Sequence, residues 1–282
     1  MDELWFSEMQ TKNVRFNVKV KNQLHHEKSD YQTISVFDSE EFGRFLTLDG
    51  IISLTEKDEF IYHEMITHPA MAVNPDIRNV LVIGAGDGGV VRELCRYKSI
   101  LRIDAVEIDR RVTEVCREYL PETAGSFEDE RVSLYIEDGL RFIRKKENVY
   151  DLIIVDTTDF SGPGEVLFTR EFYGSCSRAL TQNGIFLTQQ ESPFYTEDED
   201  ELKETYQRLA RSFPVSRIYQ AYNPIGTAGH WLFSFASKKF DPLTDADTEK
   251  WDRLGIKTRY YNTALQREAF CLPNYLKELF SL

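Results

Sequence analysis

The stretch from Asn79 to Asp109 combines residue types that suit the binding of a nucleotide. An apolar run from Val80 to Ile83 leads into the sequence GAGDGG, and a second apolar run ends in Glu107. This order predicts a strand, a glycine turn, a helix and a second strand that ends in an acid. The glycines let the backbone approach a ligand closely, and the acid can accept hydrogen bonds from a ribose diol.

Asp87 distinguishes this turn from one that binds a dinucleotide. A carboxylate inside the turn would repel a pyrophosphate at the helix N-terminus, whereas it would attract a cation. We therefore expect Gly84, Gly86 and Asp87 to contact a ligand, and the turn favours an adenosyl ligand with a positive sulfonium or ammonium group over NAD.

Acids and amides follow the other predicted strands as well. In an open parallel sheet, ligands bind beyond the carboxyl ends of the strands. The residues expected at that edge are Asp138, Gly139, Asp156, Asp159, Gln189 and Glu191. Each one alone has a structural explanation, such as a helix N-cap at Asp109 or Asp138. Together they predict an acid-lined cleft for two cationic ligands. The loop 156–165 at this edge is either a mobile lid or an ordinary strand-to-helix connection.

Composition restricts the partners of the chain. Its 282 residues carry a formal net charge of −13, which argues against nucleic acid or an anionic membrane as the main partner. This charge is compatible with cationic substrates, although solubility alone also favours an acidic surface. There is no apolar run of about 20 residues and no signal-like N-terminus. The four cysteines and five histidines lack metal-ligand spacing, so we expect a reduced, cytoplasmic protein without a metal site.

The hydrophobic periodicity predicts an α/β fold. Residues 1–55 alternate as a small antiparallel meander with turns near Asn22, around 28–30 and at 49–50, and residues 56–73 change to helical spacing. Strands are expected at 79–84, 102–107, 132–136, 151–156, 184–189, 214–220 and 230–237. Helices are expected near 88–97, 109–119, 139–145, 169–180 and 197–212. This alternation predicts a doubly wound, mostly parallel sheet with an antiparallel edge. The expected domains are 1–55 and 56–282.

At this point the chain resembles the polyamine aminopropyltransferases, the spermidine synthase family. The matching segments are LDG at 48–50, EKDEFIYHEM at 56–65, the GAGDGG turn, EID at 107–109, DG at 138–139, DTTD at 156–159, GP at 162–163, LFT at 167–169, FY at 172–173 and LPNYL at 272–276. They cover essentially the whole length in order. The resemblance implies a methyltransferase-like Rossmann domain with an N-terminal β-domain for oligomer contacts, in a homodimer or homotetramer.

The resemblance also implies roles for individual residues. On the donor side, decarboxylated S-adenosylmethionine is held as co-substrate, with no tightly bound cofactor. Glu107 holds the ribose hydroxyls and Asp87 binds the amine of the aminopropyl arm. The residues that meet the adenine or help to seat the nucleoside are Asp138, Gly139, Pro163, Leu167, Gln32 and His63. Asp156 is the catalytic acid at the reacting amine. Tyr62, Asp159 and Gln189 line the acceptor side.

The implied reaction explains these residue types. The donor sulfonium activates the adjacent methylene toward displacement by an amine, and methylthioadenosine leaves as a neutral thioether. The acceptor, putrescine for a spermidine synthase, arrives protonated with a pKa of about 10. Asp156 can accept or relay its proton.

Two departures from the family pattern fall on the acceptor side. The acceptor loop reads PIGTAG at 224–229, so that Gly226 stands where the family has a tyrosine, and Phe160 follows Asp159 where the family has proline. Agmatine, cadaverine or a longer polyamine therefore remains an alternative acceptor, and intact S-adenosylmethionine an alternative donor for carboxyaminopropyl transfer. More distant alternatives are a methyltransferase, an NAD oxidoreductase and a polyamine-binding protein without turnover.

Overall fold

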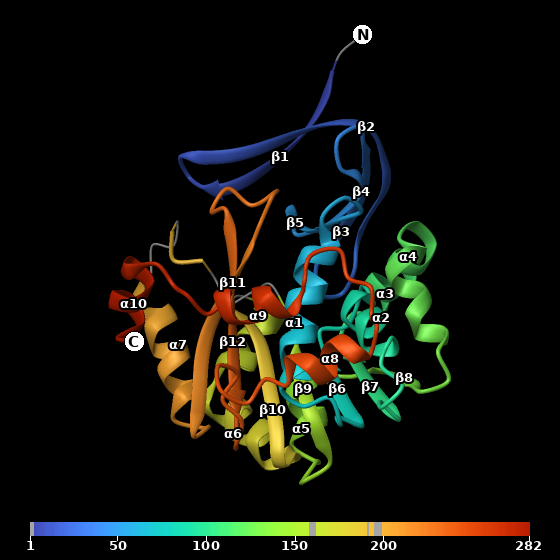
Figure 1. Cartoon of the computed structure of the whole chain (residues 1–282). Helices are drawn as coiled ribbons and strands as arrows, with labels where there is room; N and C mark the ends of the chain where they lie inside the picture. Colours follow the sequence, from blue (N-terminus) through green and yellow to red (C-terminus); the bar gives the residue numbers. More distant parts are fainter. Residues whose placement is uncertain (1–2, 158–161, 191, 195–198) are drawn as a thin grey trace.

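Two β-sheets organise the part of the chain that the computed structural model describes, residues 3–157, 162–190, 192–194 and 199–282. The first sheet is an antiparallel meander of β1 (Leu4–Thr11), β2 (Val14–Lys28), β3 (Thr33–Ser39), β4 (Gly43–Leu48) and β5 (Ile51–Thr55). It lies at one end of the molecule, beyond the edge of the second sheet (Figure 1).

The predicted turn near Asn22 is wrong. Strand β2 runs through this position, and its pairing with β3 shifts register between Val20 and Asn22 and again between Gln23 and His25. Such bulges bend a strand without reversing it. The chain instead reverses at residues 12–13 and 40–42, which were not predicted, and at the two expected places after Lys28 and at 49–50.

The second sheet confirms the predicted α/β fold. In the described residues its strand order is β11–β12–β10–β9–β6–β7–β8. The strands are β6 (Asn79–Ile83), β7 (Arg102–Glu107), β8 (Val132–Ile136), β9 (Tyr150–Val155), β10 (Leu180–Gln190), β11 (Val215–Tyr222) and β12 (His230–Ser237). Strands β6 to β10 are parallel, whereas β11 and β12 form the expected antiparallel edge. The carboxyl ends of the parallel strands therefore face one edge, toward the first sheet.

Helices cover this sheet on both faces (Figure 1). They are α1 (Glu59–Val73), α2 (Gly89–Cys95), α3 (Arg110–Tyr119), α4 (Pro121–Ala124), η1 (Gly125–Glu128), α5 (Gly139–Ile143), η2 (Gly162–Phe168), α6 (Arg170–Ala179), α7 (Glu199–Ala210), α8 (Thr248–Arg253), α9 (Thr263–Glu268) and α10 (Asn274–Phe280). The short helices α4, η1 and η2 and the last three helices were not predicted; α8 packs on α1, and α10 packs on α7. No helix among the described residues is both long and apolar enough to cross a membrane.

Helix α1 links the two sheets. It follows β5 directly and packs against α2, α8 and strands of the second sheet. Every residue of α1 except Phe60 is buried, including its acids and histidines. Phe60 is only partly covered and lies beneath the guanidinium group of Arg259. The buried polar residues of α1 must therefore find partners inside the protein.

The glycine turn brings the ends of two strands together. Gly84 has φ +84°, and a Cβ at this position would overlap the backbone carbonyl oxygen of Asp156. The amide of Asp156 donates to the carbonyl of Ile83 at 2.7 Å. Glycine is therefore required where β6 passes closest to the residue that follows β9.

We expect Gly84→Ala to destabilise the protein by about 2 kcal/mol or more, because it adds a left-handed penalty to a backbone overlap. Gly174→Ala is the matched control, since Gly174 is exposed in α6 with open space around its Cα. That change should be neutral or raise stability by up to about 1 kcal/mol. Chemical unfolding monitored by circular dichroism measures both, and equal stabilities for the two variants would contradict this account.

Candidate functional site

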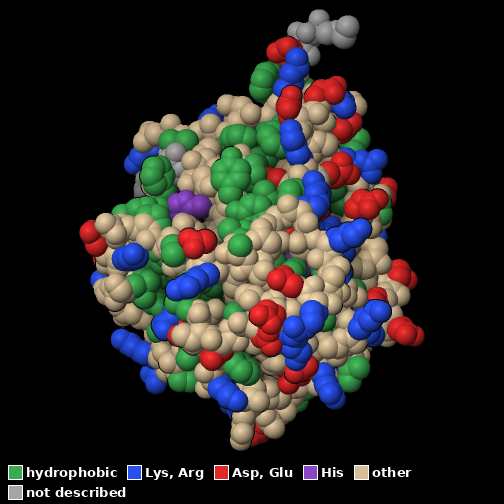
Figure 2. Space-filling model, viewed as in Figure 1, with side chains coloured by type: hydrophobic (Ala, Val, Ile, Leu, Met, Phe, Trp, Pro, Cys, Tyr) green, Lys and Arg blue, Asp and Glu red, His purple; other side chains and the backbone are tan. Residues whose placement is uncertain are grey.

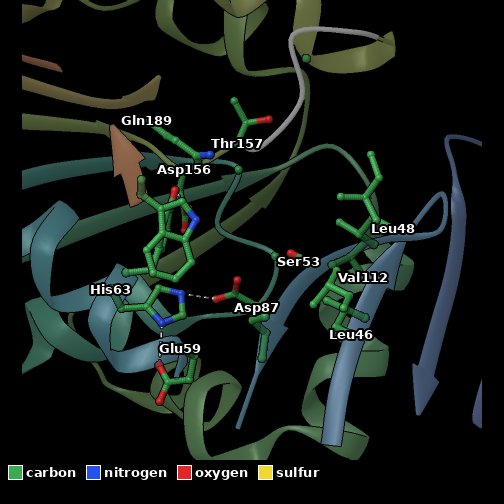
Figure 3. Close-up of a pocket in the computed structure, with 18 of the residues that line it drawn as sticks. Leu46, Leu48, Ser53, Glu59, His63, Asp87, Val112, Asp156, Thr157 and Gln189 are labelled. Atoms are coloured by element: carbon green, nitrogen blue, oxygen red, sulfur yellow. Dashed lines mark hydrogen bonds and ion pairs between the residues drawn. The ribbon is translucent and has the colours of Figure 1, made fainter. Parts of the chain in front are cut away.

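A cavity of about 360 Å³ lies between the two sheets, at the carboxyl ends of the parallel strands. All the sequence-predicted site residues whose side chains are described line it: Gln32, Tyr62, His63, Gly84, Gly86, Asp87, Glu107, Asp138, Gly139, Asp156, Leu167 and Gln189. Asp159 lies outside the described residues, and so does the side chain of Pro163. The structure thus brings the described candidates into one place (Figure 3).

Sequence reasoning missed the wall that the first sheet contributes. Leu46 and Leu48 of β4 form an apolar surface together with Val112 of α3, across the cavity from His63 and Asp87 (Figure 3). Trp231 of β12 and Glu8 of β1 also line the cavity. The LDG segment was the available sequence signal for β4, and nothing local marked Trp231 or Glu8.

Glu107 ends β7 and projects into the cavity. Its Oε1 accepts a hydrogen bond from the amide of Asp109 at 2.8 Å. Gly86 leaves room for this carboxylate, because a Cβ there would lie 3.0 Å from Oε2 of Glu107 and 2.7 Å from Val112. Burial raises the pKa of Glu107 to about 7, with a further contribution from the charge of Asp109.

Gln32 connects the first sheet to Asp109, two residues after Glu107. Its Nε2 donates to Oδ2 of Asp109 at 3.2 Å, and Ser29 donates to the same oxygen at 2.6 Å. The other oxygen of Asp109 accepts from the amide of Arg111 at 3.0 Å and so caps α3. The loop between β2 and β3 is thereby fixed beside Glu107.

Asp138 and Gly139 have structural roles as well as places in the cavity wall. Oδ1 of Asp138 accepts from the amide of Arg141 at 2.8 Å, which caps α5. A Cβ at Gly139 would overlap the side chain of Ile83. Leu167 lies nearby, 3.5 Å from the position of that Cβ. These residues form a corner of the cavity wall that is partly polar and partly apolar.

Asp87 faces a buried histidine. His63 lies between two acids, with Nε2 at 3.5 Å from Oδ1 of Asp87 and Nδ1 at 2.6 Å from Oε2 of Glu59 (Figure 3). The amide of Gly89 also donates to Oδ1 of Asp87 at 2.6 Å. Although burial acts in the opposite direction, Asp87 and Glu59 raise the pKa of His63 to about 10. His63 is thus a buried cation between two carboxylates.

Asp156 follows β9 and faces Tyr62 of α1. The hydroxyl of Tyr62 donates to Oδ1 of Asp156 at 2.9 Å. The other carboxylate oxygen of Asp156, Oδ2, is buried and has no hydrogen-bond partner in the described part of the chain. Burial, followed by the charge of Asp87, raises the pKa of Asp156 well above its usual range. This carboxylate can therefore accept a proton near neutral pH.

Gln189 is the next-to-last residue of β10 and lies beside Asp156 and Thr157 (Figure 3). Its side chain is 9% exposed, and its Oε1 has no hydrogen-bond partner among the described residues. A ligand with N–H or O–H groups would satisfy this carbonyl oxygen.

The acids of the cavity attract cations. Ligand atoms of His63, Asp87 and Asp156 lie within 4.8 Å of one another. A metal ion would have to displace the proton that Asp87 and Glu59 favour on His63. An ammonium or sulfonium group on an organic ligand fits this cluster better.

Comparison with known proteins agrees with the geometry. The family model of the spermine/spermidine synthase domain matches residues 59–247, and that of the spermidine synthase tetramerisation domain matches residues 4–56. A polyamine aminopropyltransferase of Clostridium perfringens is 61% identical over 277 residues, which are 98% of each chain. Another, of Alkaliphilus oremlandii, is 58% identical over the same shares.

Solved structures show the same fold over nearly the whole chain. A spermidine synthase in complex with the transition state analogue AdoDATO has a TM-score of 0.95 and 38% identity, covering 99% of this chain and 95% of that one. The spermidine synthase of Thermotoga maritima also has a TM-score of 0.95, with 37% identity and coverage of 100% and 95%.

The raised pKa of Glu107 predicts how stability changes with pH. In the unfolded chain this carboxyl ionises near its usual value of 4.5, whereas in the folded protein it does so near 7. Folding therefore loses stability as pH rises from about 4.5 to 7, by about 1.4 kcal/mol per pKa unit or roughly 3 kcal/mol in total.

Glu107→Gln should remove this loss and raise the free energy of unfolding by about 1–3 kcal/mol at pH 8, and by less at pH 5. Urea unfolding of the ligand-free protein at the two pH values measures the difference. Glu147→Gln is the control, because Glu147 is exposed on the surface. A Glu107→Gln variant less stable than the native protein at pH 8 would show that the carboxylate stabilises the empty cavity.

Proposed function

The chain belongs to the spermine/spermidine synthase family, and from that membership we propose that this aminopropyltransferase moves the aminopropyl group of decarboxylated S-adenosylmethionine to putrescine. The products are spermidine and methylthioadenosine. One observation supports the proposal above others: Asp87, Glu107 and Asp156 follow three neighbouring strands and line one buried cavity. Both proposed substrates are cations, so both are attracted to this site.

On the donor side, Glu107 accepts hydrogen bonds from the ribose hydroxyls, and Asp87 binds the ammonium of the aminopropyl arm. The corner formed by Asp138 and Gly139, with Leu167 and Pro163, holds the adenine. Gln32 supports Glu107 through Asp109. His63 supports the donor through Asp87, since both its ring nitrogens face acid oxygens.

On the acceptor side, Asp156 is the base. The protonated amine first gives a proton to Asp156. The hydrogen bond from Tyr62 and the charges of the ligands hold the carboxylate of Asp156 in place. The freed nitrogen lone pair then forms a bond to the methylene next to sulfur, while the carbon–sulfur electron pair returns to sulfur. Neutral methylthioadenosine leaves. The positive charges of donor and acceptor favour ionised Asp156, so the base is ready when both are bound.

Gly226 favours a second candidate acceptor. This residue lines the cavity, and its amide donates to Oδ1 of Asn223 at 2.8 Å. The tyrosine of the family is absent here, and the side chain of Asn223 occupies the place that a Cβ at this position would take. Agmatine, cadaverine or a longer polyamine is therefore the alternative to putrescine, with Asp159 and Gln189 on the acceptor path. Asp87 disfavours intact S-adenosylmethionine, whose additional carboxylate it would repel.

We also propose that residues 1–55 act as an oligomerisation domain beside a catalytic domain of residues 56–282, in a dimer or tetramer. Leu4, Trp5 and Met9 of β1 are exposed, at 49%, 52% and 62%. Hydrophobic side chains gather in the upper part of the face shown in Figure 2, toward the first sheet. Such an apolar surface suits contact with another copy of the chain.

A mass-spectrometric screen of putrescine, cadaverine, agmatine and spermidine with each donor tests the proposal. We expect spermidine from putrescine with the decarboxylated donor, and little product from intact S-adenosylmethionine. Faster turnover of another amine would replace putrescine as the acceptor. Equal turnover of the intact donor would indicate carboxyaminopropyl transfer, and the absence of any product would indicate a binding protein.

We expect Asp156→Asn to lower kcat by about 10²–10⁴-fold, because it keeps the shape of the side chain but removes the base. Methylthioadenosine affinity, measured by calorimetry on the same variant, should remain nearly unchanged and serves as the control for folding. The native rate should rise through mildly alkaline pH as the acceptor amine deprotonates. If the variant kept more than about a tenth of kcat, the proton would leave by another route.

A further inference from the structure

A row of alternating charges extends from Asp87 into the contact between α1 and α2. Asp87 faces His63, and His63 faces Glu59, as described above. Behind them, the guanidinium of Arg92 binds both oxygens of Glu59, with Nη1 at 2.8 Å from Oε1 and Nη2 at 2.8 Å from Oε2. Neither Glu59 nor Arg92 takes part in the proposed chemistry.

The geometry of this row is fixed by packing. Glu59 and His63 are one turn apart on α1, which places both side chains on the same face of the helix. Gly89, the first residue of α2, lies against His63, and a Cβ there would overlap the imidazole ring. The side chains of His63 and Glu59 are 2% and 8% exposed. The ring therefore presents one nitrogen to each acid.

Several charged or titratable groups face His63. Glu59 and Asp58 come from the start of α1, Asp87 from the glycine turn and Asp156 from the end of β9. Arg92 of α2 lies behind Glu59, and the ring of Tyr62 packs edgewise at 5.5 Å. Acids outnumber bases in this group. A protonated His63 is therefore the state that the surroundings favour.

This row of charges favours the ionised form of Asp87 over that of the other cavity acids. Against the effect of burial, His63 and Arg92 lower the pKa of Glu59 to about 2. His63 in turn lowers the pKa of Asp87 against the same effect, with help from the amide of Gly89. The pKa values of Glu107 and Asp156 are raised instead, because burial and the charges of neighbouring acids outweigh the lowering effect of His63 on Asp156. The anion at the proposed ammonium site thus depends on residues outside the cavity chemistry.

We propose that Glu59 and Arg92 are positioning residues for the donor: acting through His63, they keep the carboxylate of Asp87 ionised and directed at the donor's ammonium group. This inference rests on the proposed function, in which Asp87 binds that group. Arg92 fixes the position of Glu59 with a bidentate contact. Glu59 keeps His63 protonated, and the positive charge of His63 keeps Asp87 ionised.

Loss of the row has a specific consequence. Without the charge of Glu59, His63 gives up its proton at a lower pH, and Asp87 is left beside Glu107 and Asp156 without a cation. Asp87 then takes up a proton as pH falls toward neutrality, and the donor ammonium loses its partner. The donor's affinity should fall at neutral pH and return at alkaline pH, while kcat at saturating donor changes little.

Calorimetry with two ligands between pH 6.5 and 9 tests this inference. Decarboxylated S-adenosylmethionine carries the ammonium group, whereas methylthioadenosine lacks it. We expect Glu59→Gln and Arg92→Met to weaken binding of the donor by roughly tenfold at pH 7, with most of the loss recovered at pH 9. Methylthioadenosine affinity should change by less than about twofold, because it makes no contact that depends on Asp87 ionisation.

Two further variants control for charge and for folding. Arg92→Lys keeps the positive charge but not the bidentate guanidinium contact. Its loss of affinity for the donor should therefore be smaller than that of Arg92→Met. Arg102→Met removes a similar pair with buried Asp104, joined at 2.8 Å, at the opposite ends of the strands. It should leave the affinity for both ligands unchanged.

The outcomes separate this inference from the proposed function. If the native protein bound the donor no better than methylthioadenosine, the ammonium site itself would be wrong. The native protein could bind the donor more tightly than methylthioadenosine, and Glu59→Gln could show the same ratio of affinities at every pH. In that case only the positioning role would be overturned. An equal loss of affinity for both ligands would indicate a structural defect, and it would also overturn the positioning role.

The protonation of His63 gives a readout without any ligand. In ¹⁵N NMR spectra of the ligand-free protein, His63 should show both ring nitrogens protonated through neutral pH in the native chain. In Glu59→Gln this signature should disappear at a lower pH. Retention of the imidazolium signature in that variant up to pH 9 would overturn the proposed row of charges.

Discussion

The crowding of three carboxylates in one buried cavity is the constraint on which the rest of the structure depends. Asp87, Glu107 and Asp156 cannot all be ionised in the empty cavity without a large cost, because each loses hydration and repels the others. Burial accordingly raises the pKa of Glu107 to about 7, and burial together with Asp87 raises that of Asp156. Cationic ligands relieve this repulsion. The binding of donor and acceptor therefore creates the ionised base that the proposed reaction needs.

The fold is arranged to bring these acids together. Three neighbouring parallel strands, β9, β6 and β7, deliver them to one edge, and Gly84 lets β6 and the residue after β9 meet without a clash. Helix α1, which is buried along nearly its whole length, supplies partners for two of the acids: His63 for Asp87 and Tyr62 for Asp156. The first sheet then closes the cavity with apolar side chains, which exclude water and strengthen every charge interaction inside.

The sequence predicted the parts of this arrangement that carry a local signal. An apolar run followed by glycine or an acid is such a signal, so the parallel strands and the acids at their ends were found. Contacts between distant segments carry none. Glu59 and Arg92 are 33 residues apart and look like ordinary charged helix positions. Trp231 resembles any aromatic residue of a strand. Helices α8, α9 and α10 were missed because six or seven residues give too few turns for periodicity. The equally short α2 and α5 were found because each follows a predicted strand and its turn. The bend of β2 was mistaken for a turn near Asn22, since a bulge has no distinctive sequence.

The two ends of the cavity are built differently. The proposed donor end is formed by α1, the glycine turn, the strand ends of the second sheet and Gln32 of the loop between β2 and β3, where the sequence keeps the family pattern. At the other end, the connection between β11 and β12 reaches the first sheet (Figure 1), where the hydroxyl of Thr227 donates to Oε1 of Gln10 at 2.9 Å. Gln10 in turn donates to Glu8, which also accepts from the amide of Ile52. The acceptor end thus depends on a contact between two sheets. Since Gly226 belongs to this same connection, a change in acceptor preference can arise there while the donor end remains intact.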